Sequence, residues 1–149
     1  MLNQKAPHFS ELKKYLDSKK YNFLVLYFYP KDNTPSCTKE ACSIRDNFAE
    51  LEKSKIKIIG VSPDSSESHD KFKTKYELPF QLIPDEDKSL ATSYGVWGEK
   101  SMYGRKYFGI LRKTFIIDSS GKIIRVIDKV DTANHANQIL DEMKNNKIF

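Results

Sequence analysis

An uninterrupted apolar segment constrains the fold more than any other feature of this 149-residue sequence. Residues 22–29 read NFLVLYFY and are followed by Pro30. A strand without a polar face must be covered on both sides, so we expect it to lie at the centre of a sheet with helices on either side. The segment is far shorter than the roughly 20 apolar residues that cross a bilayer, so we expect no membrane partner.

The remaining patterns alternate between helix and strand. We expect helices at residues 10–20, 38–53, 65–76, 87–94 and 132–145, and strands at residues 56–61, 80–83, 110–117 and 122–130. Between the last two strands, the segment DSSG predicts a hairpin turn in which Gly121 adopts a positive φ. A βαβ unit followed by an antiparallel hairpin predicts an α/β protein with a mixed central sheet flanked by helices, as in a thioredoxin-like fold.

No linker, repeat or low-complexity segment interrupts the chain, so we expect a single domain over residues 1–149. The net charge is +5, but the lysines lie in short groups, mostly beside acidic residues. This pattern is typical of solvated helix faces, and no nucleic-acid motif accompanies it. The first residues lack the basic and apolar regions of a signal peptide, so we expect a cytoplasmic protein.

The sequence contains two cysteines, Cys37 and Cys42. Structural disulfides are rare in a reducing cytosol, so a pair this close is expected to be catalytic or metal-binding. Cys37 lies where a predicted loop meets a predicted helix, and the free N–H groups and dipole of a helix N-terminus favour a thiolate. In an intact helix the two residues would be about 7.5 Å apart along the axis, whereas a disulfide spans less than roughly 7 Å between Cα atoms. Bridging them therefore requires local unwinding, which suits a switch.

Residues 27–46, YFYPKDNTPSCTKEACSIRD, resemble the active-site signature of the peroxiredoxins. The pattern Pro-x-x-x-Thr-x-x-Cys is complete in Pro30, Thr34 and Cys37. A second cysteine five residues later on the same helix is similar to the branch called peroxiredoxin Q or bacterioferritin comigratory protein. Residues 95–100 (GVWGEK) and 109–118 (GILRKTFIID) match further segments of that branch, so the resemblance covers almost the whole chain.

The resemblance implies a role for each residue of the motif. Cys37 would attack the peroxide and Cys42 would resolve the sulfenic acid as a disulfide. Thr34 would offer its hydroxyl to the thiolate and the peroxide, Arg112 would polarise the peroxide and hold the sulfur ionised, and Pro30 would shield the pocket from water. The substrates would be hydrogen peroxide and organic hydroperoxides, without a cofactor or metal, and thioredoxin or a similar dithiol protein would recycle the enzyme. Relatives in this branch are often monomeric, which predicts a monomer.

Two departures from the family pattern stand out. Ser36 occupies the position before the cysteine where relatives usually carry glycine, so the loop is expected to be stiffer or to offer the thiolate a hydroxyl neighbour. Between Pro7 and Phe23, a helical, lysine-rich stretch replaces the usual β-hairpin, which leaves the N-terminal sheet edge open to question.

Two other functions fit parts of the sequence. A thiol-disulfide oxidoreductase could use the same fold, but such enzymes favour two residues between their cysteines, whereas four separate Cys37 from Cys42. A basic, non-catalytic nucleic-acid-binding module is the alternative from a different class, and salt-dependent binding would reveal it.

Two further groups of residues carry weaker signals. The three histidines, His8, His69 and His135, are scattered and lie in no zinc motif, so we expect no zinc site built with the cysteines. The aromatic residues around position 100 could line a ligand pocket, but we expect them to pack in the core or against loops. They are Trp97, Tyr103, Tyr107 and Phe108.

Overall fold

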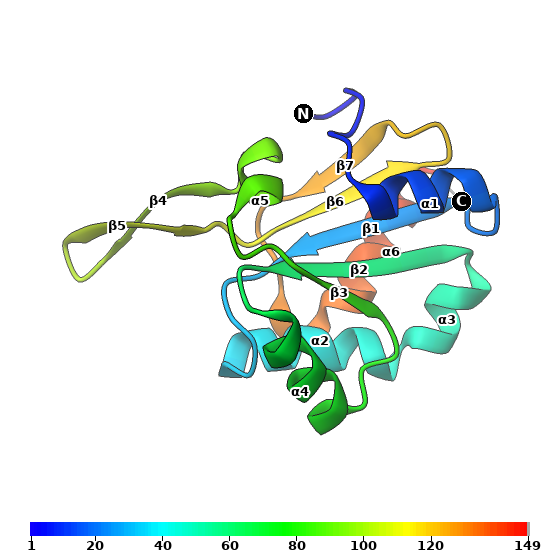
Figure 1. Cartoon of the computed structure of the whole chain (residues 1–149). Helices are drawn as coiled ribbons and strands as arrows, with labels where there is room; N and C mark the ends of the chain where they lie inside the picture. Colours follow the sequence, from blue (N-terminus) through cyan, green and yellow to red (C-terminus); the bar gives the residue numbers. More distant parts are fainter. Residues whose placement is uncertain (149) are drawn as a thin grey trace.

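The computed structural model describes residues 1–148, which form two sheets and the helices around them (Figure 1). The helices are α1 (Ser10–Ser18), α2 (Pro35–Asp46), α3 (Phe48–Lys53), α4 (Ser66–Tyr76), α5 (Ser89–Ser93) and α6 (His135–Asn145), with a 3-10 turn at Thr132–Asn134. The strands are β1 (Phe23–Phe28), β2 (Ile56–Ser62), β3 (Gln81–Pro84), β4 (Trp97–Met102), β5 (Arg105–Ile110), β6 (Lys113–Asp118) and β7 (Ile123–Ile127). The main sheet has the order β3-β2-β1-β6-β7, and β4 pairs with β5 separately.

Strand β1 lies at the centre of the main sheet, as its apolar sequence predicted. It runs parallel to β2 and antiparallel to β6. Its side chains alternate between two buried clusters: Val25 and Tyr27 belong to one, and Leu24 and Leu26 to the other. The sheet is therefore mixed and covered on both faces, which confirms the predicted architecture.

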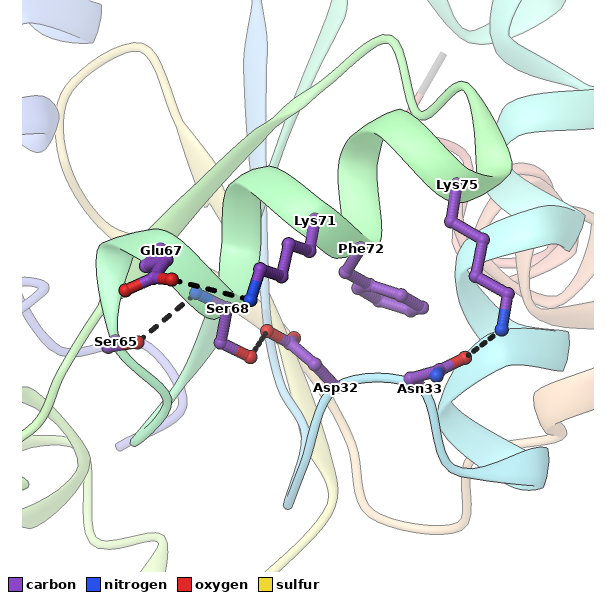
Figure 2. Close-up of a pocket in the computed structure, with 8 residues that line it drawn as sticks. All are labelled: Asp32, Asn33, Ser65, Glu67, Ser68, Lys71, Phe72 and Lys75. Carbon is purple, nitrogen blue, oxygen red and sulfur yellow. Dashed lines mark hydrogen bonds and ion pairs between the residues drawn. The ribbon is translucent and has the colours of Figure 1, made fainter.

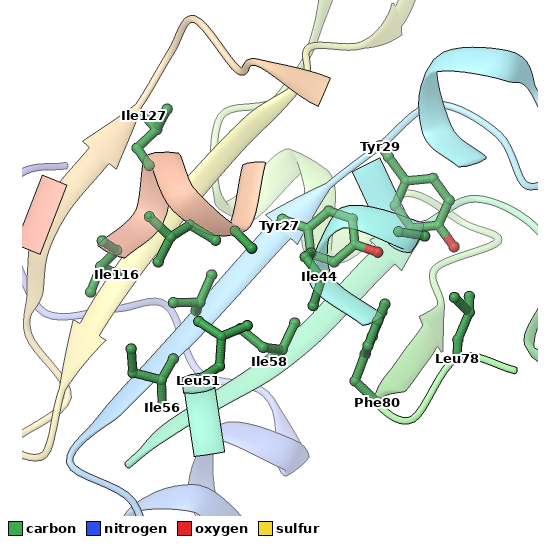
Figure 3. Packing of buried hydrophobic residues seen from close by; sticks show 14 of the residues in the cluster. Tyr27, Tyr29, Ile44, Leu51, Ile56, Ile58, Leu78, Phe80, Ile116 and Ile127 are labelled. Carbon is green, nitrogen blue, oxygen red and sulfur yellow. The ribbon is translucent and has the colours of Figure 1, made fainter. Parts of the chain in front are cut away.

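Different helices supply the two clusters. On one face, side chains from α2, α3, α4 and α6 pack on the sheet (Figure 3); on the other, side chains from α1 and α5 do so. Figure 3 shows Ile44 of α2 and Leu51 of α3 against the side chains of β1 and β2. The first face includes α2, which carries both cysteines.

Gly60 lets β1 and β3 pack closely against β2. A Cβ atom at this position would lie 2.8 Å from Leu82 Cδ2 and 2.9 Å from Tyr27 Cζ. These distances are too short for carbon–carbon contacts, so the absent side chain makes room for the Tyr27 ring.

The helix expected over residues 38–53 differs from the prediction in two ways. It begins three residues earlier, with Pro35 in the first turn, where a missing N–H costs nothing. It is also interrupted at Asn47, whose backbone leaves the helical region (φ −115°, ψ 16°). The side-chain amide of Asn47 donates a hydrogen bond to the Ser43 carbonyl. Local hydrogen bonding by asparagine competes with the helix and separates α2 from α3.

The expectation that the aromatic residues near position 100 pack in the core or against loops was wrong for Tyr103, Tyr107 and Phe108, which are exposed, whereas Trp97 packs against a buried cluster. They lie on the β4–β5 hairpin, which reaches away from the rest of the structure (Figure 1), and Tyr103 and Phe108 are 98% and 64% exposed. Trp97 is half-buried and stacks on Phe108. The hairpin turns at Tyr103 and Gly104, both with positive φ. Tyr-Gly is an unusual pair for such a turn, which is why the sequence did not reveal it.

Several predicted boundaries also moved. The strand expected over residues 110–117 is divided: β5 ends at Ile110 and β6 begins at Lys113, so Leu111 and Arg112 connect the two sheets. The last helix begins as a 3-10 turn, and the strand expected at 122–130 is shorter at both ends. At the N-terminus, the predicted short helix is confirmed as α1, with Phe9 as its N-cap residue. No helix within residues 1–148 is long and apolar enough to span a membrane.

Candidate active site

The N-terminal turn of α2 presents Cys37. Thr34 is the N-cap residue and Cys37 is the third residue of the helix. The first intrahelical bond runs from the Thr38 N–H to the Thr34 carbonyl at 2.8 Å, so the N–H groups of Ser36 and Cys37 precede the regular helical ladder. The sulfur is buried, with the residue 2% exposed. An anion at this position meets the positive end of the helix dipole.

Arg112 connects the sulfur to a buried acid. Its Nη2 lies 3.2 Å from Cys37 Sγ, and its Nη1 donates to Glu40 Oε1 at 2.6 Å. Burial works to lower the pKa of Arg112, but the charges of Glu40 and Cys37 raise it overall. The guanidinium therefore remains charged and offers N–H groups in a fixed geometry.

Glu40 lies one helical turn after Cys37 on the same buried side of α2. Its side chain is fully buried, and burial raises its pKa to about 7, even though Arg112 acts in the opposite direction. Sequence reasoning did not identify this residue. The signal was present, because an acidic residue three positions after Cys37 shares a helix face with otherwise apolar side chains.

Lys100 supplies a second positive charge near the sulfur. Its Nζ donates to the Ile110 carbonyl at 2.9 Å. Burial lowers its pKa, the charge of Arg112 lowers it further, and Cys37 works in the other direction. Its place beside the site depends on the fold of the β4–β5 hairpin, so no local sequence signal pointed to it.

Asp32 anchors the loop that leads into α2. Its carboxylate accepts hydrogen bonds from the Tyr29 hydroxyl at 2.6 Å, the Ser68 hydroxyl at 2.8 Å and His69 Nδ1 at 2.7 Å; Figure 2 shows the bond to Ser68 on α4. Although burial pushes the pKa of Asp32 upward, the three hydrogen bonds hold it below its ordinary value. His69 Nε2 also contacts the Ile83 carbonyl, which can only accept.

The group Asp32, Asp64 and His69 has the residue types and spacing of a candidate metal site. Its ligand atoms are already engaged, however. Asp64 Oδ2 accepts from the Ser62 hydroxyl and from the Asp32 N–H, while both ring nitrogens of His69 have protein partners. The arrangement is that of a hydrogen-bonded anchor for the loop.

The other residues that the sequence singled out lie near Cys37. Pro30 is half-buried at the end of β1, and the Thr34 hydroxyl donates to the Lys31 carbonyl at 3.1 Å rather than to the sulfur. Cys42 is half-buried on α2, and both cysteines are free thiols. Five residues of helix turn the two side chains roughly 140° apart, so α2 keeps the thiols apart while it is intact.

Comparison with known proteins assigns this arrangement to a family. A family model described as AhpC/TSA family matches residues 2–126. The chain belongs to the peroxiredoxins of the AhpC/TSA family. Peroxiredoxin Bcp of Bacillus subtilis is 46% identical over 146 residues, covering 96% of this chain and 90% of the relative. Peroxiredoxin Bcp of Escherichia coli is 45% identical over 121 residues, covering 81% and 78% of the two chains.

Solved structures agree with this assignment. The bacterioferritin comigratory protein of Xanthomonas campestris, described in connection with alkyl peroxide reduction, superposes with a TM-score of 0.79 at 38% identity and covers 87% of this chain and 83% of that one. This peroxiredoxin therefore has a thioredoxin-like fold, and its predicted resemblance to the peroxiredoxin Q branch is confirmed. It is a thiol peroxidase, and its substrate is a peroxide.

Proposed function

We propose that this peroxiredoxin reduces hydrogen peroxide and organic hydroperoxides through Cys37, with Cys42 as the resolving residue. The contact between Arg112 Nη2 and Cys37 Sγ carries the proposal, because peroxide reduction requires a thiolate with a fixed cation beside it. The alkyl peroxide chemistry named for the Xanthomonas campestris relative supports the inclusion of organic hydroperoxides.

In the first step, the Cys37 thiolate attacks one oxygen of the peroxide, and the O–O bond breaks. The sulfur becomes a sulfenic acid, and the other oxygen leaves as hydroxide or alkoxide, which takes up a proton to form water or an alcohol. Arg112 and the Thr34 hydroxyl, which turns away from the Lys31 carbonyl, stabilise the departing oxygen. Pro30 limits the access of water.

In the second step, the Cys42 thiol attacks the sulfenic sulfur, and a disulfide and one water molecule form. The intact α2 helix holds the two sulfurs on different sides. The first turns of α2 therefore unwind before the disulfide closes. Ser36, the second residue of α2, lies within this segment and makes it stiffer than glycine would.

An external dithiol protein of the thioredoxin type completes the cycle by reducing the disulfide and becoming oxidised itself. We further infer that the protein is a cytoplasmic monomer in which one domain, residues 1–149, carries out the whole cycle. A reducing compartment suits this assignment because it keeps donor dithiols available.

A coupled assay tests the proposal. Peroxide should be consumed only when thioredoxin, its reductase and NADPH are supplied, and Cys37→Ser should abolish turnover. Full activity of Cys37→Ser would refute the assignment of the attacking sulfur. Consumption with another dithiol but not with thioredoxin would refute only the donor.

A further inference from the structure

On the side of Arg112 that faces away from Cys37, a carboxylate oxygen and an imidazole nitrogen face each other in the interior. Within residues 1–148, Glu40 Oε2 has no hydrogen-bond partner, and it lies 3.5 Å from His135 Nε2. Both side chains are fully buried. Buried carboxylate oxygens in folded proteins are almost always hydrogen-bonded, so this pair calls for a physical explanation.

The contacts of Gln138 determine which nitrogen of His135 carries hydrogen. The Gln138 amide nitrogen donates to the Lys129 carbonyl at 2.7 Å, and its Oε1 accepts from the Asp131 N–H at 2.9 Å. The same Oε1 lies 2.9 Å from His135 Nδ1, so Nδ1 is the protonated nitrogen. In the neutral ring, Nε2 is then an acceptor, and the Thr114 hydroxyl 2.8 Å away donates to it.

We propose that Glu40 and His135 share one proton, and that this buried pair acts as a positioning unit that directs the charge of Arg112 toward Cys37. Without that proton, Oε2 is a buried acceptor without a donor; with it, the Glu40 O–H points at the Nε2 lone pair, which it shares with the Thr114 hydroxyl. A protonated Glu40 still accepts a hydrogen bond from Arg112 through Oε1 but no longer neutralises it. The positive charge is then available to the thiolate.

The proton count shows how the pair acts on the reacting sulfur. A Cys37 thiol with an ionised Glu40 and a Cys37 thiolate with a protonated Glu40 contain equal numbers of protons and have equal net charge. Only the second arrangement places the negative charge on sulfur. Two anions on one guanidinium repel each other, and the His135 lone pair favours the second arrangement by accepting the Glu40 proton.

The charged and titratable groups around the pair are consistent with this location of the proton. Burial raises the pKa of Glu40 to about 7 and lowers that of His135 to about 4, so between these values the proton is on Glu40 and His135 is neutral. Asp131 and Arg112 act on His135 in opposite directions. From β1, Tyr27 adjoins Glu40, and burial raises the pKa of Tyr27 so far that it remains uncharged.

Lys100 and Cys37 are two further titratable groups around the pair, and both act on it through Arg112. The proposal rests on Cys37 being the reacting sulfur, but its structural part can be tested separately through protein stability. The useful comparison is between Glu40→Gln, which resembles the protonated acid, and His135→Asn, which removes the proton acceptor.

The test measures the urea-induced unfolding equilibrium of the reduced full chain against pH. In the unfolded chain, His135 binds a proton below about pH 6.5 and Glu40 releases one above about pH 4.5. In the folded protein the proton is on Glu40. Between about pH 4.5 and about pH 6.5 the pair therefore holds one proton in both the folded and the unfolded state. It gives the stability of the wild type almost no pH dependence in this range.

Each variant removes one titratable group of the pair, so that the pH dependence due to the other can be measured. In Glu40→Gln, only the lowered pKa of His135 remains, so the unfolding constant should rise on the order of a hundredfold as pH falls from about 6.5 to about 4. In His135→Asn, only the raised pKa of Glu40 remains, so the constant should rise as pH increases from about 4.5 to about 7. Glu50→Gln, at an exposed position of α3, is the control and should not change how the unfolding constant depends on pH.

Equal losses of stability at every pH in both variants would overturn the proposal. If either variant fails to fold, infrared spectroscopy of the wild type decides: a protonated-carboxyl band that titrates near pH 7 supports it, and its absence refutes it. A kinetic experiment uses the Cys42→Ser variant. Its rate of reaction with peroxide, measured against pH, should change stepwise near pH 7, and the additional substitution Glu40→Gln should remove this change. If stability changes with pH in opposite directions in the two variants but the protein does not react with peroxide, the assigned function is refuted while the shared proton remains supported.

Discussion

Arg112 Nη2 lies 3.2 Å from Cys37 Sγ, although 75 residues separate the two in sequence. The start of α2 positions the sulfur, and the connection between β5 and β6 positions the guanidinium. Glu40 holds the other side of the guanidinium at 2.6 Å. One arginine thus contacts the proposed reacting atom and a buried acid at the same time.

Replacing Arg112 by Lys should slow the reaction with peroxide by about a hundredfold or more, because an ammonium group cannot reproduce the two-sided fork that binds Glu40 and the sulfur. Stopped-flow measurement of the first oxidation gives the rate. Arg125→Lys on β7 is the matched control and should react normally. An unchanged rate in Arg112→Lys would remove Arg112 from the mechanism.

Replacing Cys42 by Ser should leave the first oxidation intact and stop the cycle at the sulfenic acid, because the second thiol is absent. A dimedone adduct on Cys37, located by peptide mass spectrometry after one equivalent of peroxide, is the expected product. An adduct on another residue, or continued turnover with thioredoxin at the wild-type rate, would contradict the role of Cys42.

Much of the site was predictable because it is local in sequence. The proposed site residues Pro30, Thr34, Cys37 and Cys42 lie in one continuous segment, so the motif and the change from strand to helix predict them together. Arg112 required the family resemblance, since an arginine beside a strand carries no signal of its own. Glu40 was available from its spacing to Cys37, but a charged residue on an amphipathic helix is usually exposed to solvent.

Other features depend on tertiary structure and could not be derived from the sequence. Lys100 lies near the site because its strand β4 pairs with β5, which leads into Arg112, and His135 approaches Glu40 because α6 packs on α2. The hairpin was missed because a Tyr-Gly turn and exposed aromatic residues do not resemble the usual hairpin pattern. The interruption at Asn47 depends on one local hydrogen bond that competes with helix continuation.

Replacing Gly60 by Ala should reduce the free energy of unfolding by about 1 to 3 kcal/mol, because the added Cβ would overlap Leu82 and Tyr27 in the core. Urea denaturation measures the loss. Gly109→Ala is the comparison: its Cβ would meet the flexible Lys100 side chain, which can move. Equal losses in the two variants would contradict the packing argument.

Replacing His69 by Gln should destabilise the protein by about 3 kcal/mol near pH 6, because it leaves the buried Asp32 carboxylate without its charged partner. Burial lowers the pKa of His69, but Asp32 and the Ile83 carbonyl raise it overall. A raised folded-state pKa gives stability that is complete below about pH 6.5 and is lost as pH rises through the folded value. The gap between wild type and variant should therefore narrow toward alkaline pH.

Urea denaturation at several pH values measures this gap. His8→Gln, at an exposed position, is the control and should have little effect at any pH. A gap that stays constant or widens with rising pH would show that His69 is not charged in the folded protein.

Peptide mass spectrometry of the reduced wild-type protein after one equivalent of hydrogen peroxide shows whether Cys37 and Cys42 form the reacting pair. We expect a Cys37–Cys42 disulfide with the loss of two hydrogens, together with hydrogen-exchange evidence that the first turns of α2 have unwound. Two unmodified thiols, or a disulfide that joins separate molecules while α2 remains intact, would contradict this expectation.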